Sequence, residues 1–278
     1  MIQAGTQRDV WIYDNMPFTY RIAKIIFGLD FLAQNQTVWK KFEYKNTIKN
    51  KYDLFITCKT FYSVGYNILE YNLHDFSMCF QYQEEAMFVN KQWTNVGVAK
   101  GWSKSAFDVF TNQIFYTHAV QRHMIQIHSS MIDYRGKGLL FLGPSGIGKT
   151  TMAELWNQYR DALIINGDMN FVQDTGDEFI GWGTPWHGSS PYCENTSVPI
   201  QALIILRQAL ENYIRELSGF EKVQLVSNNI IYPTWLENGM ELCLETLDHL
   251  LTKLPVYELS CRPDEDAVKL TEETIFGG

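Results

Sequence analysis

The stretch of sequence that decides the fold reads Leu139-Leu140-Phe141-Leu142-Gly143-Pro144-Ser145-Gly146-Ile147-Gly148-Lys149-Thr150-Thr151. Its leading apolar residues predict a buried strand, its glycines a tight turn, and the residues from about Lys149 onward a helix. The spacing of Gly143 and Gly148-Lys149-Thr150 fits the pattern G-x-x-x-x-G-K-[ST], in which backbone N–H groups surround a polyphosphate. Glycine is needed there because a side chain would keep the backbone away from the phosphate, and because some positions adopt positive φ angles.

This loop is therefore our candidate nucleotide site. Lys149 would meet the β- and γ-phosphates, the Thr150 hydroxyl would ligate Mg²⁺, and the N-terminus of the following helix would add partial positive charge. The alternative is an ordinary glycine-rich turn, but a chance match to the fixed positions is expected in only about one chain in a hundred of this length. The residues expected to bind ATP are Gly143, Pro144, Ser145, Gly146, Ile147, Gly148, Lys149, Thr150 and Thr151.

Composition sets limits on the class of protein. The chain has 278 residues, of which 46% are hydrophobic, so it can bury a substantial core. Its formal net charge is −8 and its pI is about 5.3. An acidic chain of this kind is a poor general binder of nucleic acid or of an anionic membrane, because those partners require clustered Lys and Arg.

Cysteine usage and hydropathy indicate a cytoplasmic protein without a membrane span. The cysteines are odd in number and form no C-x-x-C pair, so we expect reduced thiols and neither a disulfide framework nor a zinc site. We find no signal-peptide pattern near residue 1 and no run of about 18 apolar residues. The cysteines are Cys58, Cys79, Cys193, Cys243 and Cys261.

Residues 1–103 are expected to form a β-rich N-terminal region. Short apolar runs at 52–56, 76–80 and 86–89, separated by Asn, Asp and Gly, predict antiparallel strands. Five lysines crowd one segment of this region, which is either a solvated loop or a docking site for an acidic peptide. These lysines are Lys40, Lys41, Lys45, Lys49 and Lys51.

Residues 104–278 are expected to form the nucleotide-binding domain of an α/β (α+β) protein. The predicted helices cover about 105–124, the residues after Lys149, 208–217, part of 233–253 and a start near 263–267, and the helix in 233–253 is expected to turn Leu244, Leu247 and Leu251 inward. The predicted strands cover 124–132, 139–142, 162–168, 202–206 and 256–259, with a hairpin at 171–180 and a long irregular stretch at 183–199.

Two polar residues on these strands are candidates for chemistry. Asp168 ends an apolar strand, and a carboxylate in that position is costly unless a cation uses it, so we expect it to reach Mg²⁺. His128 lies on the strand that would pair with the strand entering the loop, and the hairpin could bring it near the phosphates. His187 could be either a site residue or a packed anchor of the irregular stretch, because Trp182 and Trp186 are close. His74, His118, His123 and His249 show no partner pattern and are expected to be structural.

The order of His128, the phosphate loop, Asp168 and Gly183-Thr184-Pro185-Trp186-His187-Gly188 resembles the C-terminal domain of HPr kinase/phosphorylase. It is more similar still to smaller relatives, the kinases encoded beside lasso-peptide precursors. The resemblance covers roughly residues 104–275. It implies a fold related to phosphoenolpyruvate carboxykinase and an ATP- and Mg²⁺-dependent kinase acting on a serine-type hydroxyl of a peptide or protein. It also implies that the chain can form a homo-oligomer.

The resemblance also implies roles for individual residues. Lys149 and Thr150 would hold phosphates and Mg²⁺, His128 would lie close to the transferred phosphate, and Asp168 would be the general base. HPr kinases have two adjacent acids at that strand end, whereas Gly167 stands in place of the first here, which argues against the reverse reaction. The family's arginine-rich segment is also missing in its usual form, and Arg262 and Arg207 remain as the candidates for stabilising the transition state.

Two alternatives use the same residues. One is a kinase for a small molecule, and the other is a module that binds a nucleotide without transferring phosphate.

Overall fold

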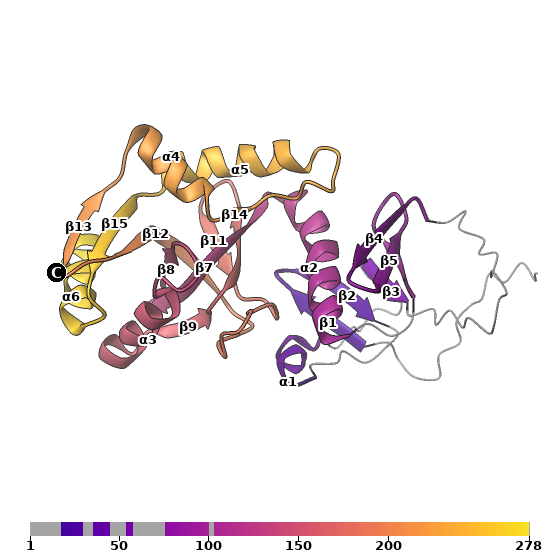
Figure 1. Cartoon of the computed structure of the whole chain (residues 1–278), viewed down its shortest axis with the longest axis horizontal. Coiled ribbons are helices and arrows are strands. Elements are labelled where there is room, and N and C mark those ends of the chain that lie inside the picture. Colours follow the sequence, from indigo (N-terminus) through magenta and orange to yellow (C-terminus); the bar gives the residue numbers. More distant parts are fainter. Residues whose placement is uncertain (1–17, 30–35, 45–53, 58–75, 100–102, 278) are drawn as a thin grey trace, which may run out of the picture.

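The computed structural model describes residues 18–29, 36–44, 54–57, 76–99 and 103–277. It is a mixed α/β structure built on two β-sheets (Figure 1). Helix α2 (Lys104–Val120) lies between the N-terminal sheet and the larger second sheet.

The N-terminal sheet has six strands in the order β1-β2-β3-β6-β5-β4. Strand β3 pairs parallel with both β2 and β6, so our expectation of antiparallel pairing was wrong for the run at 52–56, whereas β4 and β5 pair antiparallel as expected. The other pairs join neighbours along the chain through short turns, which forces an antiparallel arrangement, whereas β3 is reached through a long connection. The strands are β1 (Phe18–Ile22), β2 (Ile25–Leu29), β3 (Leu54–Thr57), β4 (Met78–Tyr82), β5 (Glu85–Val89) and β6 (Asn95–Ala99).

Part of the lysine-rich segment lies beside this sheet. Helix α1 (Gln36–Trp39) continues into a 3-10 helix, η1 (Lys40–Phe42). Lys40 and Lys41 are therefore on a short helix, while Lys45, Lys49 and Lys51 lie outside the described residues.

The second sheet has nine strands, with the main order β11-β10-β7-β8-β12-β15-β13 and with β9 and β14 also paired to β7. Strands β8, β12 and β15 run parallel, and the other pairs are antiparallel. The strands are β7 (Met124–Tyr134), β8 (Lys137–Leu142), β9 (Leu163–Asn166), β10 (Met169–Asp174), β11 (Phe179–Trp182), β12 (Ser197–Gln208), β13 (Tyr213–Glu216), β14 (Ile230–Ile231) and β15 (Val256–Cys261).

The helices around this sheet confirm most of the expected ones and correct one. Besides α2 they are α3 (Lys149–Arg160), α4 (Gly219–Ser227), α5 (Gly239–Lys253) and α6 (Glu265–Phe276). The helix expected at 208–217 was wrong, since these residues form the end of β12, a turn and β13. Leu210 in this range is 88% exposed, and Arg215 pairs with Glu258 on β15 at 3.0 Å. Helix α4 was not foreseen, and Leu244 on α5 is exposed rather than turned inward.

Strict alternation of side chains gives the second sheet two buried faces. The face toward α3 and α6 carries Ile132, Tyr134, Leu139, Phe141 and Ile204. The face toward α2 and α5 carries Ile125, Ile127, Leu140, Leu142 and Leu203. Because successive residues of a strand point to opposite faces, apolar runs such as 139–142 can fill both cores at once.

The structure bears on the expected lack of a membrane span and on the expected reduced cysteines. Within the described ranges, no helix combines the length and the apolar character that crossing a bilayer requires. The cysteines in those ranges, Cys79, Cys193, Cys243 and Cys261, are free thiols, and Cys58 lies outside them.

The N-terminal sheet and the second sheet share one core through α2. The indole of Trp39 is buried, and its ring centroid lies 5.2 Å from that of Phe107 on α2 and 5.9 Å from that of Trp186. Tyr20 on β1 contacts the same indole at 5.0 Å. Trp39 is thus a central contact among those through which the N-terminal strands pack on the rest of the chain.

We expect Trp39→Ala to lower the free energy of unfolding by about 3–5 kcal/mol, because it removes a large buried ring and leaves a cavity. Denaturant unfolding measures this change. The control is Val109→Ala on the exposed side of α2, for which a change within about 0.5 kcal/mol is expected. A loss for Trp39→Ala no larger than that of the control would contradict the shared core.

Candidate active site

The loop between β8 and α3 has the backbone conformation that its glycines allow. Gly143, Gly146 and Gly148 have φ angles of 143°, 80° and 114°. Residues with a β-carbon rarely adopt these angles, so the glycine spacing in the sequence encodes the path of the loop. Within the loop, the Ile147 N–H donates to the Pro144 carbonyl at 3.2 Å. Helix α3 begins at Lys149, directly after the last of these glycines, and its first N–H groups have no partner inside the helix.

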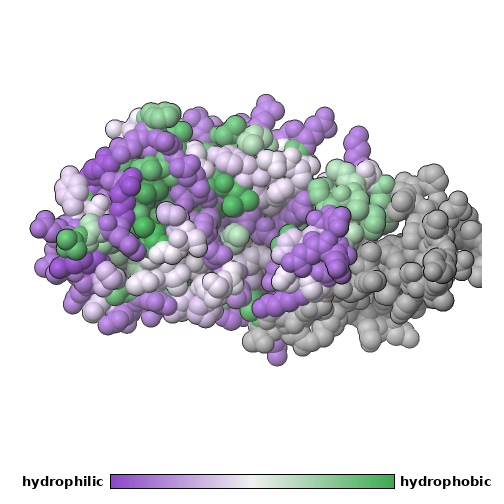
Figure 2. Space-filling model, viewed as in Figure 1, coloured by the Kyte–Doolittle hydropathy of each residue, from purple (hydrophilic) through white to green (hydrophobic). Residues whose placement is uncertain are grey.

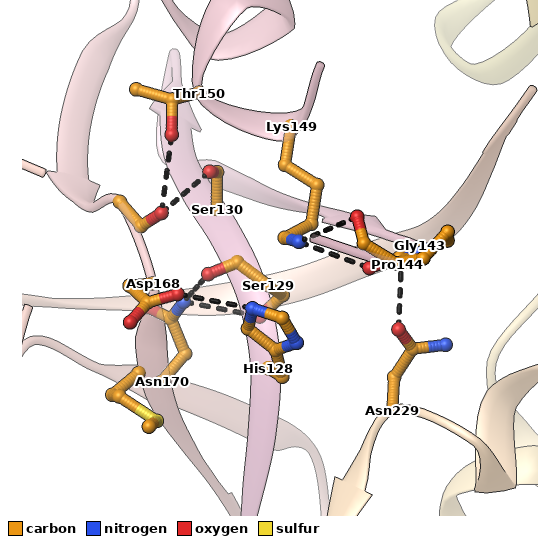
Figure 3. Close-up of polar contacts among 12 residues, drawn as sticks. His128, Ser129, Ser130, Gly143, Pro144, Lys149, Thr150, Asp168, Asn170 and Asn229 are labelled. Atoms are coloured by element: carbon orange, nitrogen blue, oxygen red, sulfur yellow. Dashed lines mark hydrogen bonds and ion pairs between the residues drawn. The ribbon is translucent and has the colours of Figure 1, made fainter. Parts of the chain in front are cut away.

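Lys149 reaches back into the loop that precedes it. Its Nζ donates to the carbonyls of Gly143 at 2.9 Å and Pro144 at 3.3 Å (Figure 3), and the residue is only 6% exposed. Burial lowers the pKa of the Lys149 ammonium, and the negative charge of Asp168 opposes that shift. A buried ammonium is stabilised by an anion, so this position favours a negatively charged ligand.

Strand β7 exchanges both of its neighbours at His128 and Ser129. On one edge it pairs with β8 up to Ser129 and then with β14 from Ile127. On the other edge it pairs with β9 and then, from His128, with β10. The glycine-rich loop leaves the sheet at this exchange on one edge, and Gly167 and Asp168 connect β9 to β10 on the other. The register of one strand therefore brings the loop, His128 and Asp168 together.

His128 and Asp168 form a pair beside Lys149 (Figure 3). Their Nε2 and Oδ1 atoms are 3.1 Å apart, and both side chains are partly exposed. The Asp168 N–H donates to Asn166 Oδ1 at 2.9 Å, and its carbonyl accepts from the Ser129 N–H at 3.0 Å. The backbone around Asp168 is thus fixed while its carboxylate remains accessible from solvent.

Thr150 and Ser130 converge on the carbonyl of Gly167, to which their hydroxyls donate at 3.4 Å and 2.9 Å. Gly167 itself has no room for a side chain, because a β-carbon there would overlap with the side chain of Ser190. A second carboxylate at position 167 is therefore sterically excluded in this structure. The hydroxyl of Thr150 and the carboxylate of Asp168 are thus two oxygen groups at this edge of the loop.

Asn229 is a site residue that the sequence did not reveal. Its Oδ1 accepts from the Gly143 N–H at 2.9 Å, and its Nδ2 donates to the Leu225 carbonyl at 2.9 Å. Its own carbonyl accepts from the His128 N–H at 2.8 Å. One buried residue therefore ties the first glycine of the loop to α4 and to β7. In the sequence Asn228-Asn229 reads only as a turn, and its partners are far away along the chain.

The irregular stretch at 183–199 approaches the carboxylate of Asp168 at Gly188. Gly188 has a φ angle of 58°, and a β-carbon there would overlap with the carboxylate of Asp168. Trp186 is buried and donates from Nε1 to Thr111 on α2 at 3.1 Å. His187 contacts the Ser190 carbonyl through Nδ1, so its ring is engaged within its own loop.

Lys41 in the N-terminal region contacts residues 193–195 of the same irregular stretch. Lys41 Nζ lies 2.5 Å from Glu194 Oε1 and donates to the Cys193 carbonyl at 2.7 Å. Asn195 donates from Nδ2 to the Lys41 carbonyl at 3.0 Å. Lys41 thus contacts this chain's own loop, and Lys40 remains exposed.

Arg207 on β12 and Arg262 after β15 lie near the glycine-rich loop, whereas His128 is on β7. The two arginines line a cavity of about 350 Å³ together with Gly146, Ile147 and Gly148, at the carboxyl ends of β12 and β15. Arg207 pairs with Glu258, and Arg262 Nε lies 3.0 Å from Asp264. Pro144, Ser145 and Thr151 are exposed around the loop. The two arginines are near the loop, but neither reaches the His128–Asp168 pair.

The other histidines that the structure describes have different surroundings. His118 Nε2 contacts the Trp93 carbonyl at 2.9 Å, and His249 lies 3.1 Å from Asp174. His123 has a φ angle of 54° in the turn before β7. His74 lies outside the described residues.

Protein side chains alone do not form a metal cage here. Among the described residues, no group of three or more His, Cys, Asp or Glu side chains could hold an ion. Mg²⁺ usually takes only one or two protein oxygens and completes its shell with phosphate and water. Thr150 and Asp168 fit that pattern, because they offer one hydroxyl and one carboxylate beside a phosphate-type loop.

The fold and the site define a mixed α/β protein whose glycine-rich strand-to-helix loop faces a His–Asp pair. The family described as SynChlorMet cassette protein ScmC matches residues 108–262, which is more than half of the chain and contains every residue of this site. The chain belongs to this family. No curated protein matches it. Solved structures that match include the Hpr(Ser) kinase/phosphatase from Coxiella burnetii, with 11% identity and a TM-score of 0.32, covering 55% of this chain and 93% of that one.

Gly188→Ala tests the contact between the irregular stretch and Asp168. We expect it to lower the free energy of unfolding by more than Gly136→Ala does. Both glycines have positive φ, which costs an alanine about 1–2 kcal/mol, but only at Gly188 must a carboxylate also move. Urea unfolding of the two variants isolates that difference. Equal losses would show that Asp168 does not depend on the backbone at Gly188.

Asn229→Ala tests the link between Asn229 and the loop. We expect it to cost about 1–3 kcal/mol of stability, because the buried N–H of Gly143 loses its acceptor. Hydrogen exchange of the Gly143 amide should accelerate in this variant and remain slow in Asn229→Asp, which keeps an acceptor oxygen. Asn228→Ala, at the exposed neighbouring residue, is the control. Unchanged protection of Gly143 in Asn229→Ala would contradict the assigned hydrogen bond.

Proposed function

We propose that this protein is an ATP- and Mg²⁺-dependent kinase that transfers the γ-phosphate to a serine-type hydroxyl of a peptide or protein. The observation that carries the proposal is the placement of a glycine-rich loop with a buried lysine, Lys149, near the partly exposed carboxylate of Asp168. His128 is the partner of that carboxylate, and it is charged only when protonated. The choice of a peptide or protein as acceptor comes from the resemblance of the residue order to HPr kinases.

The loop supplies the groups that bind a triphosphate. The backbone of 143–148, the N-terminus of α3 and the ammonium of Lys149 all favour negative charge on the same side. The cavity lined by Arg207 and Arg262 adjoins this loop and would take the base and ribose. Thr150 and Asp168 would hold Mg²⁺, which supplies positive charge for the phosphate oxygens when it is bound.

Asp168 would act as the base toward the acceptor. The hydroxyl oxygen of the acceptor forms a bond to the γ-phosphorus, and the bond from that phosphorus to the bridging β–γ oxygen breaks, so that ADP leaves. The proton of the hydroxyl passes to the carboxylate of Asp168. His128 lies 3.1 Å from that carboxylate and orients it, while Lys149 stabilises charge on the transferred group.

The site has one carboxylate where two would be needed to separate metal binding from base catalysis. Ser190 fills the space beside Gly167, so Asp168 has to serve both purposes. We therefore expect forward transfer to dominate, with no phosphate-driven reversal.

Binding of ATP with Mg²⁺, measured by calorimetry, is the first test. Lys149→Ala should weaken this binding. It should also lower kcat/KM for transfer roughly a hundredfold, which corresponds to a loss of about 3 kcal/mol of transition-state stabilisation, because a preorganised positive donor is lost. Lys137→Ala, at the exposed start of the same strand β8, is the matched control and should behave as wild type. A change below about twofold for Lys149→Ala would contradict the role of the loop.

Labelled ATP and serine-containing peptides test the chemical step. Asp168→Asn should still bind ATP but should lose transfer, because the amide cannot accept the proton. Asp177→Asn, on an exposed turn, is the control. If wild type and Asp168→Asn label the peptides equally, Asp168 is not the base.

A further inference from the structure

Exposed apolar side chains gather on α4 and α5. In the described part of the chain, Phe220 is 79% exposed and Leu244 is 48% exposed, and Val223 and Met240 are also exposed. Figure 2 shows green apolar patches among hydrophilic ones over the region formed by these helices. Apolar side chains grouped in this way on a surface indicate a binding site more often than apolar side chains scattered singly.

The two helices enclose a groove. Its volume is about 620 Å³, and its apolar lining is formed by Leu217, Val223, Leu244, Leu247 and Leu251. Leu247 is buried at the floor, while Leu244 and Val223 stand exposed on opposite walls, one on each helix. A groove between two helices with apolar walls is suited to the apolar side of a peptide segment.

Acidic side chains outnumber basic ones at the groove, whose lining includes Glu216 and Asp248 against Lys222, and further acids lie beside it on α5. The sequence contains no Lys or Arg between Lys222 and Lys253, whereas Glu237, Glu241, Glu245 and Asp248 fall in that interval and are exposed. Glu241 and Glu245 are one turn apart on α5, where like charges repel. Lys222, the basic residue of the lining, donates from Nζ to the Leu254 carbonyl at 2.9 Å.

This charge pattern decides between possible occupants. Pairing of two copies through this groove would bring two rows of carboxylates together on a chain that already carries a net charge of −8. An anionic membrane surface would be repelled in the same way. A segment with basic residues flanking apolar ones can pack its apolar side chains in the groove and pair its cations with the carboxylates, since opposite charges attract across an interface.

We propose that the groove between α4 and α5 docks a basic amphipathic segment of the acceptor, with apolar side chains between Val223 and Leu244 and with Lys or Arg facing Glu241, Glu245 and Asp248. The assignment of this segment to the acceptor rests on the proposed kinase function, whereas the docking itself does not. Recognition by a segment distinct from the phosphorylated hydroxyl raises the local concentration of that hydroxyl at the site.

The fold connects the groove to the phosphate loop. Helix α4 ends at Ser227, and Asn229 follows it within two residues. Asn229 holds Gly143 through its side chain and His128 through its carbonyl. A segment bound against α4 therefore contacts the element that anchors the loop, and docking and nucleotide binding can influence each other reciprocally.

Fluorescence anisotropy with a labelled synthetic amphipathic peptide of Leu and Lys tests the proposal. The peptide should bind the wild-type chain in the absence of nucleotide, and the same peptide with Glu in place of every Lys should not. Leu244→Ser and Asp248→Lys should each weaken binding about tenfold or more, and added salt should weaken it as well. Leu163→Ser is the matched control, because Leu163 is 46% exposed on β9 and should leave binding unchanged.

Several outcomes would overturn the proposal. They are no binding of the Lys peptide, equal binding of both peptides, or equal weakening by Leu244→Ser and Leu163→Ser. A dimer in sedimentation that Leu244→Ser dissociates would instead make the groove an interface between copies. Because binding is measured without ATP, docking without phosphate transfer rejects only the kinase function, and transfer to a serine peptide without docking rejects only the groove.

Discussion

The organisation of this molecule depends on the exchange of partners along strand β7. Backbone hydrogen bonds are obligatory for a buried strand, so when β8 leaves at Ser129 another acceptor must take over at once. The carbonyl of Asn229 does so for the His128 N–H, and β14 continues the pairing from Ile127. On the other edge the Asp168 carbonyl accepts from the Ser129 N–H. Because the pairing changes on both edges at this point, the glycine-rich loop after β8 and the carboxylate of Asp168 lie close to each other.

Features encoded by local backbone conformation could be predicted from the sequence. The loop is one, because three of its glycines occupy φ angles that other residues rarely adopt. The buried strands β8, β12 and β15 are another, because their core positions appear as apolar runs in the sequence. The position of Asp168 after a short apolar strand was readable for the same reason.

Features that depend on distant partners could not be predicted. Asn229 and Ser190 contact the site from residues far along the chain, and neither has a distinctive local pattern. Residues 208–217 were expected to be helical, but those of β13 pair with β15, where Arg215 meets Glu258. Leu244 belongs to an apolar stripe, yet its side of α5 is open to solvent. In each case contacts between segments distant in the sequence, and not local propensity, determine the secondary structure or the exposure of the residue.

The contact between Gly167 and Ser190 constrains how this site can change over time. A single substitution at 167 would force any new side chain into Ser190, whose own loop is held against Asp168 through Gly188. Adding an acidic neighbour to Asp168 would therefore need a change at Ser190 as well as at position 167. A single substitution at position 167 therefore cannot convert this site to one with two adjacent carboxylates.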